Sequence, residues 1–259
     1  RIEYEAEPGI TVPAYLLRPA NQSPDTKLPA IVALHPTTTE TIEPIAGLSG
    51  PEDKQTGLHL AQAGFIVLCP TNFLWHDVKD YREAVANFQA RHPGSLGMSK
   101  MLWDAQRSVD ILQSIDGVDP DRIGTFGHSL GAKEVLYLMA FDPRVKAGVF
   151  SEGGISFDST NWDAPWYLGE GIRDDKFPLD HHQVLALIAP RPLLILAGES
   201  GPGAADGDRS WPHVKAAQEV SSLFEGPMSL GVYNHREGHS IPLKARERSI
   251  EWLRVGLLP

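Results

Sequence analysis

Residues 127–131 read Gly-His-Ser-Leu-Gly, which matches the Gly-x-Ser-x-Gly pattern that presents a serine as a nucleophile. A short strand-like stretch at residues 121–126 precedes the pattern, and good helix formers follow it at residues 132–140. Strand, sharp turn and helix are the setting that this pattern requires. The two glycines permit a tight turn, and the amino terminus of the helix favours negative charge beside the serine. The sequence therefore predicts a nucleophilic hydroxyl at Ser129.

A serine hydroxyl attacks only with a base to take its proton, and the base needs an acid to orient it. In this arrangement the chain order is serine, acid, histidine, so the base should follow the last strand. Residues 234–240 lie there and contain His235 and His239. We favour His239, which directly precedes the last predicted helix, and keep His235 as the alternative. His128, in the variable position of the turn, is interpreted as a packing residue.

The residues alone leave the acid open. The loop after the predicted strand 192–197 offers three carboxylates, Glu199, Asp206 and Asp208. Asp208 lies nearest the following helix and could also cap it. Glu152 is a fourth candidate, because it ends the strand that follows the helix of the serine and precedes two glycines. Two acids could also share the role.

Acyl-transfer chemistry also needs N–H donors that face the developing negative charge of the oxyanion. The backbone N–H of Leu130, directly after the serine, is one candidate donor. The second should come from the loop after the predicted strand 29–34, where Pro36 has no N–H. Thr37 or Thr38 must therefore supply it.

The elements that position these residues follow from the apolar pattern. Continuous apolar runs indicate strands buried on both faces, and apolar residues at helical spacing indicate the helices between them. This alternation predicts a mostly parallel, doubly wound α/β sheet in a single domain, residues 1–259. Residues 155–181, rich in aromatic residues, interrupt the alternation, and we interpret them as an insertion over the active site. Further strands are predicted at residues 12–17, 65–69, 145–150 and 228–233, and helices at 57–63, 99–115, 212–224 and 242–253.

Composition narrows the class of protein. The chain has 259 residues, and its net charge of −10 argues against a nucleic-acid or anionic-membrane partner. No apolar run is long enough to span a bilayer, and Cys69, the single cysteine, is predicted to be buried in a strand. The sequence contains no phosphate loop, dinucleotide fingerprint or metal-binding motif, so we expect no cofactor and no metal. The chain begins at Arg1 without an initiator Met, so a secreted or periplasmic location is the expectation.

Over nearly its whole length the chain resembles the α/β-hydrolases. Within that superfamily it is most similar to the dienelactone-hydrolase-like and acetyl-xylan-esterase-like branch and to the glucuronoyl esterases. Three stretches carry the resemblance, namely residues 127–133, with a lysine four positions after the serine, residues 141–154 and residues 181–192.

The resemblance implies roles for several residues. In glucuronoyl esterases a glutamate after this strand serves as the triad acid, which makes Glu152 the leading candidate, ahead of Asp208. The lysine at the place of Lys133 contacts a uronate sugar in those enzymes. They follow the serine with an arginine, where this chain has Leu130, and dienelactone hydrolases use a cysteine where this chain has Ser129.

The function implied is that of a serine carboxylic-ester hydrolase that acts through an acyl-enzyme on acetyl or uronate esters of plant-type polysaccharide. Lys133 would contact the substrate, and Trp75, Trp162 and Trp166 could stack on sugar rings. The expected partner is a small-molecule or oligosaccharide ester. A serine peptidase of the same fold and a non-catalytic binding protein on a hydrolase scaffold are the alternatives.

Overall fold

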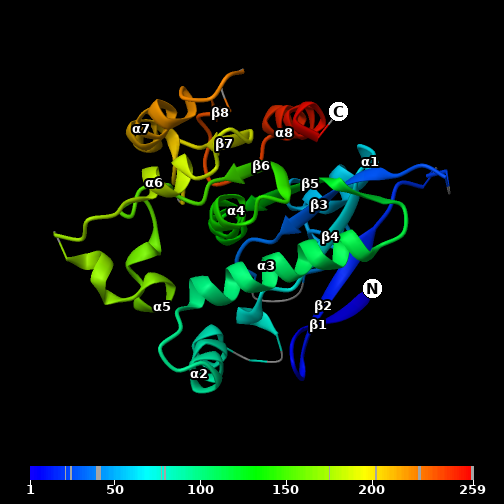
Figure 1. Ribbon diagram of the computed structural model, residues 1–259, viewed down its shortest axis with the longest axis horizontal. Helices are drawn as coiled ribbons and strands as arrows, with labels where there is room; N and C mark the ends of the chain where they lie inside the picture. Colours follow the sequence, from blue (N-terminus) through cyan, green and yellow to red (C-terminus); the bar gives the residue numbers. More distant parts are fainter. Residues whose placement is uncertain are drawn as a thin grey trace.

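The protein is built around one twisted sheet, seen in a computed structural model that describes residues 1–20, 22–23, 25–38, 42–76, 78, 80–174, 176–201, 203–226 and 229–257 (Figure 1). The described residues form eight strands in the order β1-β2-β4-β3-β5-β6-β7-β8. β2 pairs antiparallel with β1 and β4, and all other pairs are parallel, which confirms the predicted mostly parallel α/β sheet. The strands are β1 (Ile2–Glu7), β2 (Ile10–Leu17), β3 (Leu28–Leu34), β4 (Ile66–Pro70), β5 (Val118–His128), β6 (Val145–Ser151), β7 (Leu193–Ala197) and β8 (Leu230–Asn234).

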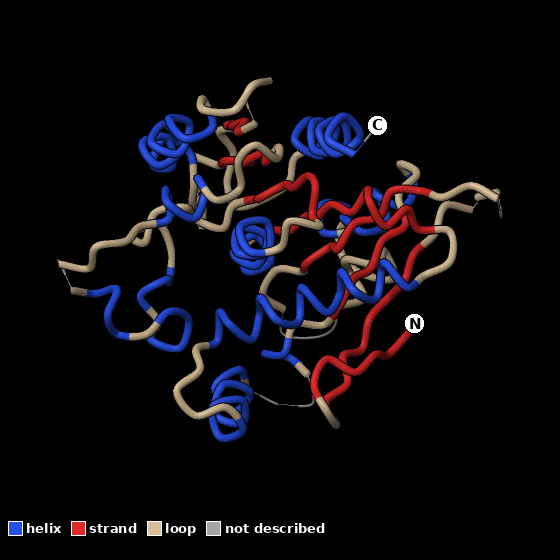
Figure 2. The backbone as a smooth tube through the Cα atoms, viewed as in Figure 1, coloured by secondary structure: helices blue, strands red, loops and turns tan. Residues whose placement is uncertain are grey.

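Helices cover both faces of the sheet (Figure 2). Successive side chains of a strand point to opposite faces. Val32 and Leu34 of β3 belong to the apolar cluster that includes residues of α3, α4, α6 and α7, whereas Ile31 and Ala33 belong to the cluster that includes residues of α1 and α8. The sheet is therefore doubly wound, as predicted. The α-helices are α1 (Thr56–Gln62), α2 (Tyr81–Arg91), α3 (Gly97–Ser114), α4 (Leu130–Phe141), α5 (Pro165–Leu168), α6 (His181–Ala186), α7 (Trp211–Ser221) and α8 (Leu243–Leu257).

The predicted elements match the observed ones to within a few residues, but four elements, namely β1, α2, α5 and α6, were not predicted. The predicted strand 228–233 begins at Met228, outside the described residues, while β8 starts at Leu230. Cys69 is fully buried in β4, as expected.

The segment 155–181 holds two short 3-10 helices, η3 (Asn161–Asp163) and η4 (Glu170–Arg173), on either side of α5. Its aromatic residues do not project into solvent. Trp162 and Tyr167 are buried in a separate apolar cluster that also contains Met98 and Met101 of α3. The segment is thus packed against the start of α3 by its own aromatic side chains.

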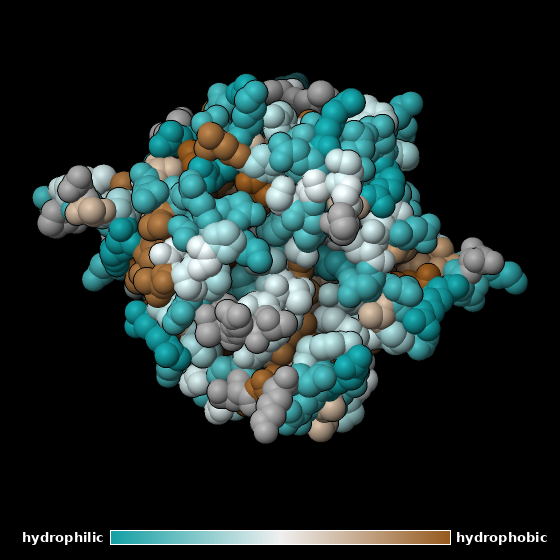
Figure 3. All heavy atoms as spheres, turned by 180° about the vertical axis from the view of Figure 1, so that it is seen from behind, coloured by the Kyte–Doolittle hydropathy of each residue, from teal (hydrophilic) through white to brown (hydrophobic). Residues whose placement is uncertain are grey.

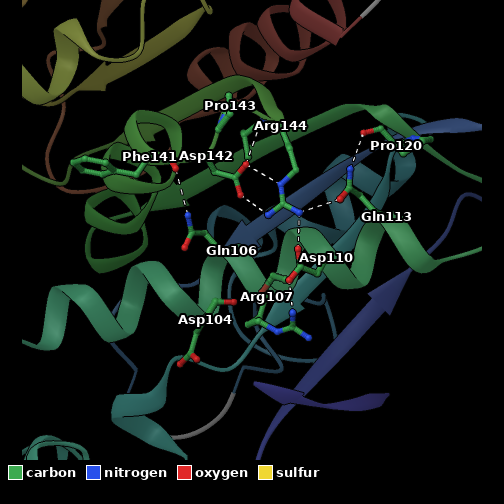
Figure 4. Close-up of polar contacts among 12 residues, drawn as sticks. Asp104, Gln106, Arg107, Asp110, Gln113, Pro120, Phe141, Asp142, Pro143 and Arg144 are labelled. Carbon is green, nitrogen blue, oxygen red and sulfur yellow. Dashed lines mark hydrogen bonds and ion pairs between the residues drawn. The ribbon is translucent and has the colours of Figure 1, made fainter. Parts of the chain in front are cut away.

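Arg144 clamps the turn between α4 and β6 against α3 (Figure 4). Its Nε and Nη2 atoms donate to the carboxylate of Asp142 at 2.9 and 2.6 Å. Its Nη1 atom donates to Asp110 at 2.5 Å and to Gln113 at 3.0 Å. Because α4 follows the predicted nucleophile and β6 precedes the leading acid, this clamp fixes the unit that carries both.

No helix among the described residues has the length and apolar character needed to cross a membrane. The face of the molecule shown in Figure 3 is mostly hydrophilic, with apolar side chains in scattered patches. This agrees with the net charge of −10.

We predict that Arg144→Met lowers the free energy of unfolding by about 2–4 kcal/mol, because it leaves the buried carboxylate of Asp142 without its guanidinium partner. Urea denaturation followed by circular dichroism measures the loss. Arg248→Met is the matched control, because Arg248 pairs with Glu251 on the surface, where both side chains are more than 60% exposed (62% and 63%), and it should cost less than about 0.5 kcal/mol. Equal losses in the two variants would contradict the clamp.

Candidate active site

Ser129 lies between β5 and α4 in a backbone conformation that residues other than glycine rarely adopt, with φ 56° and ψ −114°. Its N–H donates to the carbonyl of Ser151 at 2.8 Å, at the end of β6. A side-chain carbon at Gly127 would overlap the carbonyl of Gly131, and one at Gly131 would overlap the carbonyl of Leu34. The two glycines therefore let strand and helix approach closely and leave Ser129 at the head of α4.

Ser129 lines an open pocket of about 400 Å³. The pocket gathers residues from the loop after β3, the start of α4, the segment after β6 and the loops after β7 and β8. These positions meet because the carboxyl ends of parallel strands share one edge of a sheet. The lining residues are Thr37, Ser129, Leu130, Lys133, Glu152, Gly153, Ser159, Thr160, Asn161, Tyr167, Gly203, Ala204 and His239.

Glu152, directly after β6, is the carboxylate beside His239. Glu152 is 1% exposed. Its Oε2 atom lies 3.9 Å from Nδ1 of His239 and accepts the N–H of Ala205 at 2.8 Å. Burial acts to raise the pKa of Glu152, but two histidine rings and the Ala205 N–H outweigh it and hold the pKa below its usual value. Glu152 is therefore ionised at neutral pH, and its charge faces Nδ1 of the ring.

The hydroxyl of Ser129 and the ring of His239 line the same pocket, and the side chain of His239 is 29% exposed. Among the described residues no hydrogen bond joins the two. Catalytic hydrogen bonds of this kind often tighten only when substrate binds. With Nδ1 directed at Glu152, the Nε2 atom of His239 is the one left to serve the serine.

Two further histidines surround this pair. His235 is buried behind Glu152, with its Nε2 atom 3.5 Å from Oε1, and it lies outside the pocket lining. His128 packs against the ring of His239, with 4.6 Å between ring centroids, and its Nδ1 atom forms a hydrogen bond with Ser151 Oγ at 2.9 Å. Burial, aided by the neighbouring histidine charges, lowers the pKa of His128 to about 3, so this ring is neutral.

Asp206 is fully buried, and its carboxylate accepts hydrogen bonds from backbone N–H groups rather than from a histidine ring. Its carboxylate accepts the N–H groups of Gly154 and Ile155 at 3.0 and 2.9 Å and the hydroxyl of Ser210 at 2.5 Å. Burial raises the pKa of Asp206 to about 6. Asp206 therefore ties the segment after β6 to the loop after β7.

The remaining candidate acids lie apart from His239. Asp208 is exposed in the 3-10 helix η5 (Gly207–Ser210), and no contact between it and that ring is found among the described residues, so the geometry favours Glu152 over Asp208. Glu199 faces Arg236 at 3.8 Å.

No group of three or more His, Cys, Asp or Glu side chains in the described part of the chain is arranged to hold a metal ion.

The two threonines proposed for the oxyanion differ in the hollows that they line. Thr37 lines the pocket that contains Leu130 and also an adjacent hollow, whereas Thr38 lines two adjacent hollows and not that pocket. The buried His35 fixes this loop, because its Nε2 atom accepts a backbone N–H at 2.9 Å and its Nδ1 atom donates to a carbonyl at 2.7 Å. Of the two threonines, Thr37 is therefore the one that shares the pocket of Ser129 with Leu130.

Lys133 points from α4 into a cage formed by the segment 155–181. Its Nζ atom donates to Asn161 Oδ1 at 2.7 Å and lies 4.2 and 4.3 Å from the ring centroids of Trp162 and Tyr167. Burial lowers the pKa of Lys133 to about 7, against the opposing effect of nearby acids. The ammonium form therefore prevails below neutral pH and declines above it.

The three tryptophans expected to stack on sugars have other neighbours. Trp162 is 0% exposed and its Nε1 atom donates to a backbone carbonyl at 2.7 Å, so the expectation is wrong for Trp162, which is a core residue beneath the lysine. Trp166 stacks on Tyr167 with 3.7 Å between ring centroids, and Trp75 packs edge-on against a histidine ring. Neither Trp166 nor Trp75 lines the pocket around the serine.

Sequence reasoning missed several residues of the pocket. Ser159, Thr160, Asn161 and Tyr167 all come from the segment 155–181. The only signal was the interruption of the strand–helix alternation, which placed the segment near the site. It could not select individual side chains.

Comparison with known sequences finds hydrolases and esterases. The chain is 26% identical over 264 residues to the putative hydrolase YtaP of Bacillus subtilis, covering 95% of this chain and 83% of that protein. It is 26% identical over 125 residues to 4-O-methyl-glucuronoyl methylesterase 1 of Sodiomyces alcalophilus, covering 38% of this chain. That second match spans 25% of the methylesterase's length.

Solved structures share the fold. A carbohydrate esterase family 15 glucuronoyl esterase from Caldicellulosiruptor kristjansonii superposes with a TM-score of 0.71 at 19% identity, covering 95% of this chain and 73% of that one. A putative dipeptidyl aminopeptidase IV from Bacteroides ovatus superposes with a TM-score of 0.73 at 19% identity, covering 98% of this chain and 35% of that one.

The sequence model of the dienelactone hydrolase family matches residues 12–189. This range contains most of β2, all of β3 to β6, the turn at Ser129 and Glu152. Because the match extends over more than half of the sequence, the chain belongs to the dienelactone hydrolase family.

Proposed function

We propose that this protein is a serine carboxylic-ester hydrolase whose catalytic side chains are Ser129, His239 and Glu152. The observation that carries the proposal is the convergence of these three on one pocket, with the serine on a strained turn and an ionised carboxylate beside the ring. Relatives named as a hydrolase and as glucuronoyl methylesterases support the same class of reaction.

In the proposed reaction the Oγ atom of Ser129 attacks the ester carbonyl while Nε2 of His239 takes its proton. The oxyanion forms beside the backbone N–H groups of Leu130 and Thr37, and each such donor contributes about 3 kcal/mol. His239 then gives its proton to the alcohol oxygen as the bond between this oxygen and the carbonyl carbon breaks, so the alcohol departs and the acyl group stays on Oγ of Ser129. Water attacks the acyl carbon while the same ring takes its proton, and the ring returns that proton to Ser129 Oγ as the acid is released. Glu152 stabilises the imidazolium in both steps.

The lining of the pocket supports a sugar acid ester as the substrate. A pocket of about 400 Å³ is much larger than an acetyl group, and its walls carry hydroxyl, amide and ammonium groups from Ser159, Thr160, Asn161 and Lys133. Such groups suit the hydroxyls of a uronate ring. We therefore favour uronate esters of plant-type polysaccharide over acetyl esters, which places the proposed activity outside the cytoplasm.

A peptidase or a non-catalytic binding protein explains the site less well. A binding protein has no need of a serine held at φ 56° next to a paired histidine and carboxylate. The likeness to a putative dipeptidyl aminopeptidase covers 35% of that chain and reflects the shared fold. Turnover of matched ester and amide substrates separates the two enzyme classes.

We expect Ser129→Ala to lower kcat on a methyl uronate by about 10⁴-fold or more, because no other hydroxyl occupies the head of α4. Initial rates measured with the purified variant test this. Ser222→Ala, at an exposed site at the end of α7, is the matched control and should keep the wild-type rate. Retention of more than about a tenth of the activity in Ser129→Ala would refute the mechanism.

The identity of the acid is tested by a pair of isosteric changes. Glu152→Gln should lower kcat by about 10³- to 10⁴-fold, because the neutral amide neither orients nor stabilises the imidazolium. Asp208→Asn should leave kcat within about twofold of wild type, since Asp208 is exposed and apart from the ring. A large loss in the second variant and a small loss in the first would assign the acid to the later loop.

Lys133 should make the binding of uronate esters depend on pH. As the pH rises through about 7, the ammonium is lost and KM for a methyl uronate should increase several-fold. KM for an aryl acetate, which lacks the sugar hydroxyls, should change little over the same range. Lys133→Met should raise KM for the uronate at low pH and abolish its pH dependence. An unchanged pH dependence in this variant would exclude Lys133.

A further inference from the structure

We propose that His235 is a positioning residue, which donates a hydrogen bond to Glu152 from behind and thereby holds the carboxylate for His239. This inference rests on the proposed ester hydrolysis and adds a second histidine to its machinery. His235 touches neither the pocket nor the serine, so it acts through Glu152 alone.

The carboxylate of Glu152 lies between two imidazoles. Oε1 faces Nε2 of His235 at 3.5 Å, and Oε2 faces Nδ1 of His239 at 3.9 Å. Oε1 of Glu152, Nε2 of His235 and Nδ1 of His239 are all buried, and none of them has a hydrogen-bond partner among the described residues. A buried polar atom without a partner costs about 1–3 kcal/mol, so a small rotation that joins these atoms is favourable.

The backbone assigns the proton of His235. The N–H of Glu237 donates to Nδ1 of His235 at 3.2 Å, so that nitrogen accepts and the neutral ring carries its proton on Nε2. Nε2 is the atom that faces Glu152. His235 can therefore donate to the carboxylate without becoming charged.

The position of His235 is fixed by the loops on either side. Its own N–H donates to the carbonyl of Ala197 at 2.9 Å, and the carbonyl of Glu237 accepts the N–H groups of Glu199 and Ser200 at 3.0 and 3.3 Å. These bonds join the ends of β7 and β8. These backbone bonds hold the ring of His235 beside Glu152. The side chain of His235 is buried, whereas that of His239 is partly exposed.

The three donors around Glu152 face different oxygens of its carboxylate. The N–H of Ala205 and the ring of His239 share Oε2, and His235 takes Oε1. Without the donor on Oε1, the carboxylate could rotate and offer either oxygen to the pocket. The buried charge would also lose one of the contacts that keep it ionised.

Two sets of variants test the proposal. His235→Phe removes the donor, and His235→Gln retains an N–H group at a similar reach. His92→Phe is the control, because His92 lies at the end of α2 and pairs with Glu7 away from the site. We expect His235→Phe to lower kcat by about 10- to 100-fold with little change in KM, and His235→Gln to recover part of the loss.

The pH profile gives a readout that a merely structural role would not move. Contact with His235 helps to lower the pKa of Glu152, so removing it should let the pKa of this carboxyl rise. The acid limb of kcat/KM in His235→Phe should therefore move to higher pH. The other titratable groups facing Glu152, namely His239, His128 and Asp206, are unchanged in this variant.

A spectroscopic measurement does not require activity. Nitrogen-15 NMR of histidine-labelled protein at neutral pH should show the proton of His235 on Nε2 and that of His239 on Nδ1, with the signals assigned by their loss in substitution variants. In His235→Phe the fraction of His239 with its proton on Nδ1 should fall.

The outcomes separate the two proposals. Ester hydrolysis that survives Ser129→Ala overturns the proposed function. Wild-type kcat and pH profile in His235→Phe, together with inactivity of Ser129→Ala, overturn the role of His235 alone. A proton on Nδ1 of His235 in the NMR spectra overturns it as well. Loss of kcat, a shifted acid limb and recovery in His235→Gln establish it.

Discussion

The close approach of α4 to the ends of β3 and β5 is the constraint on which the site depends. Gly131 has no room for a side chain beside the carbonyl of Leu34, and Gly127 has none beside the first turn of α4. This packing forces Ser129 into its left-handed conformation and sets the helix amino terminus against the nucleophile. It also brings Thr37 and Leu130 to the same pocket. One contact therefore positions both the proposed nucleophile and the residues proposed to bind the oxyanion.

A second layer of order comes from buried carboxylates. Glu152 and Asp206 are both buried. Glu152 accepts the N–H of Ala205, and Asp206 accepts those of Gly154 and Ile155, in each case from a segment distant in the sequence. Burying a charge is costly unless it is paired and hydrogen-bonded, so these contacts strongly favour one arrangement of the loops after β6 and β7. The groups that prepare the site for chemistry also hold its walls together.

The sequence predicted the fold well wherever burial leaves a clear pattern. β3 and β4 are continuous apolar runs, because both faces are covered. β1 was missed because exposed glutamates alternate with Tyr4 and Ala6 in an edge strand that is buried on one face only. α2 was missed because its buried face consists of only Ala84, Val85 and Phe88 within eleven residues. An apolar pattern that is weak, or that marks only one buried face, does not distinguish a strand or a helix from a loop.

The site was predictable only in part, for physical reasons. Chain order led to the loop 234–240, because the last strand of such a sheet carries its loop to the serine, and the position before the last helix favoured His239 over His235. The acid could not be ranked from residues alone, since several acids follow suitable strands, and only resemblance favoured Glu152. Trp162 was misjudged because residue type does not reveal whether an aromatic ring faces a pocket or a core. That choice depends on tertiary packing, which here turns the ring beneath Lys133.

The placement of Lys133 on the helix that follows Ser129 has a consequence for selectivity if the proposed contact of this lysine with the substrate is correct. The two residues are four positions apart, which corresponds to a rise of about 6 Å along α4. Because a helix is rigid, the distance between the ester carbon that Ser129 would attack and the substrate oxygen that Lys133 would contact is set by the protein. This distance cannot adapt to the substrate. Molecules with polar atoms one or two bonds farther from the ester would fit poorly, however similar their overall size. Discrimination would then follow from helical geometry rather than from the shape of a flexible loop.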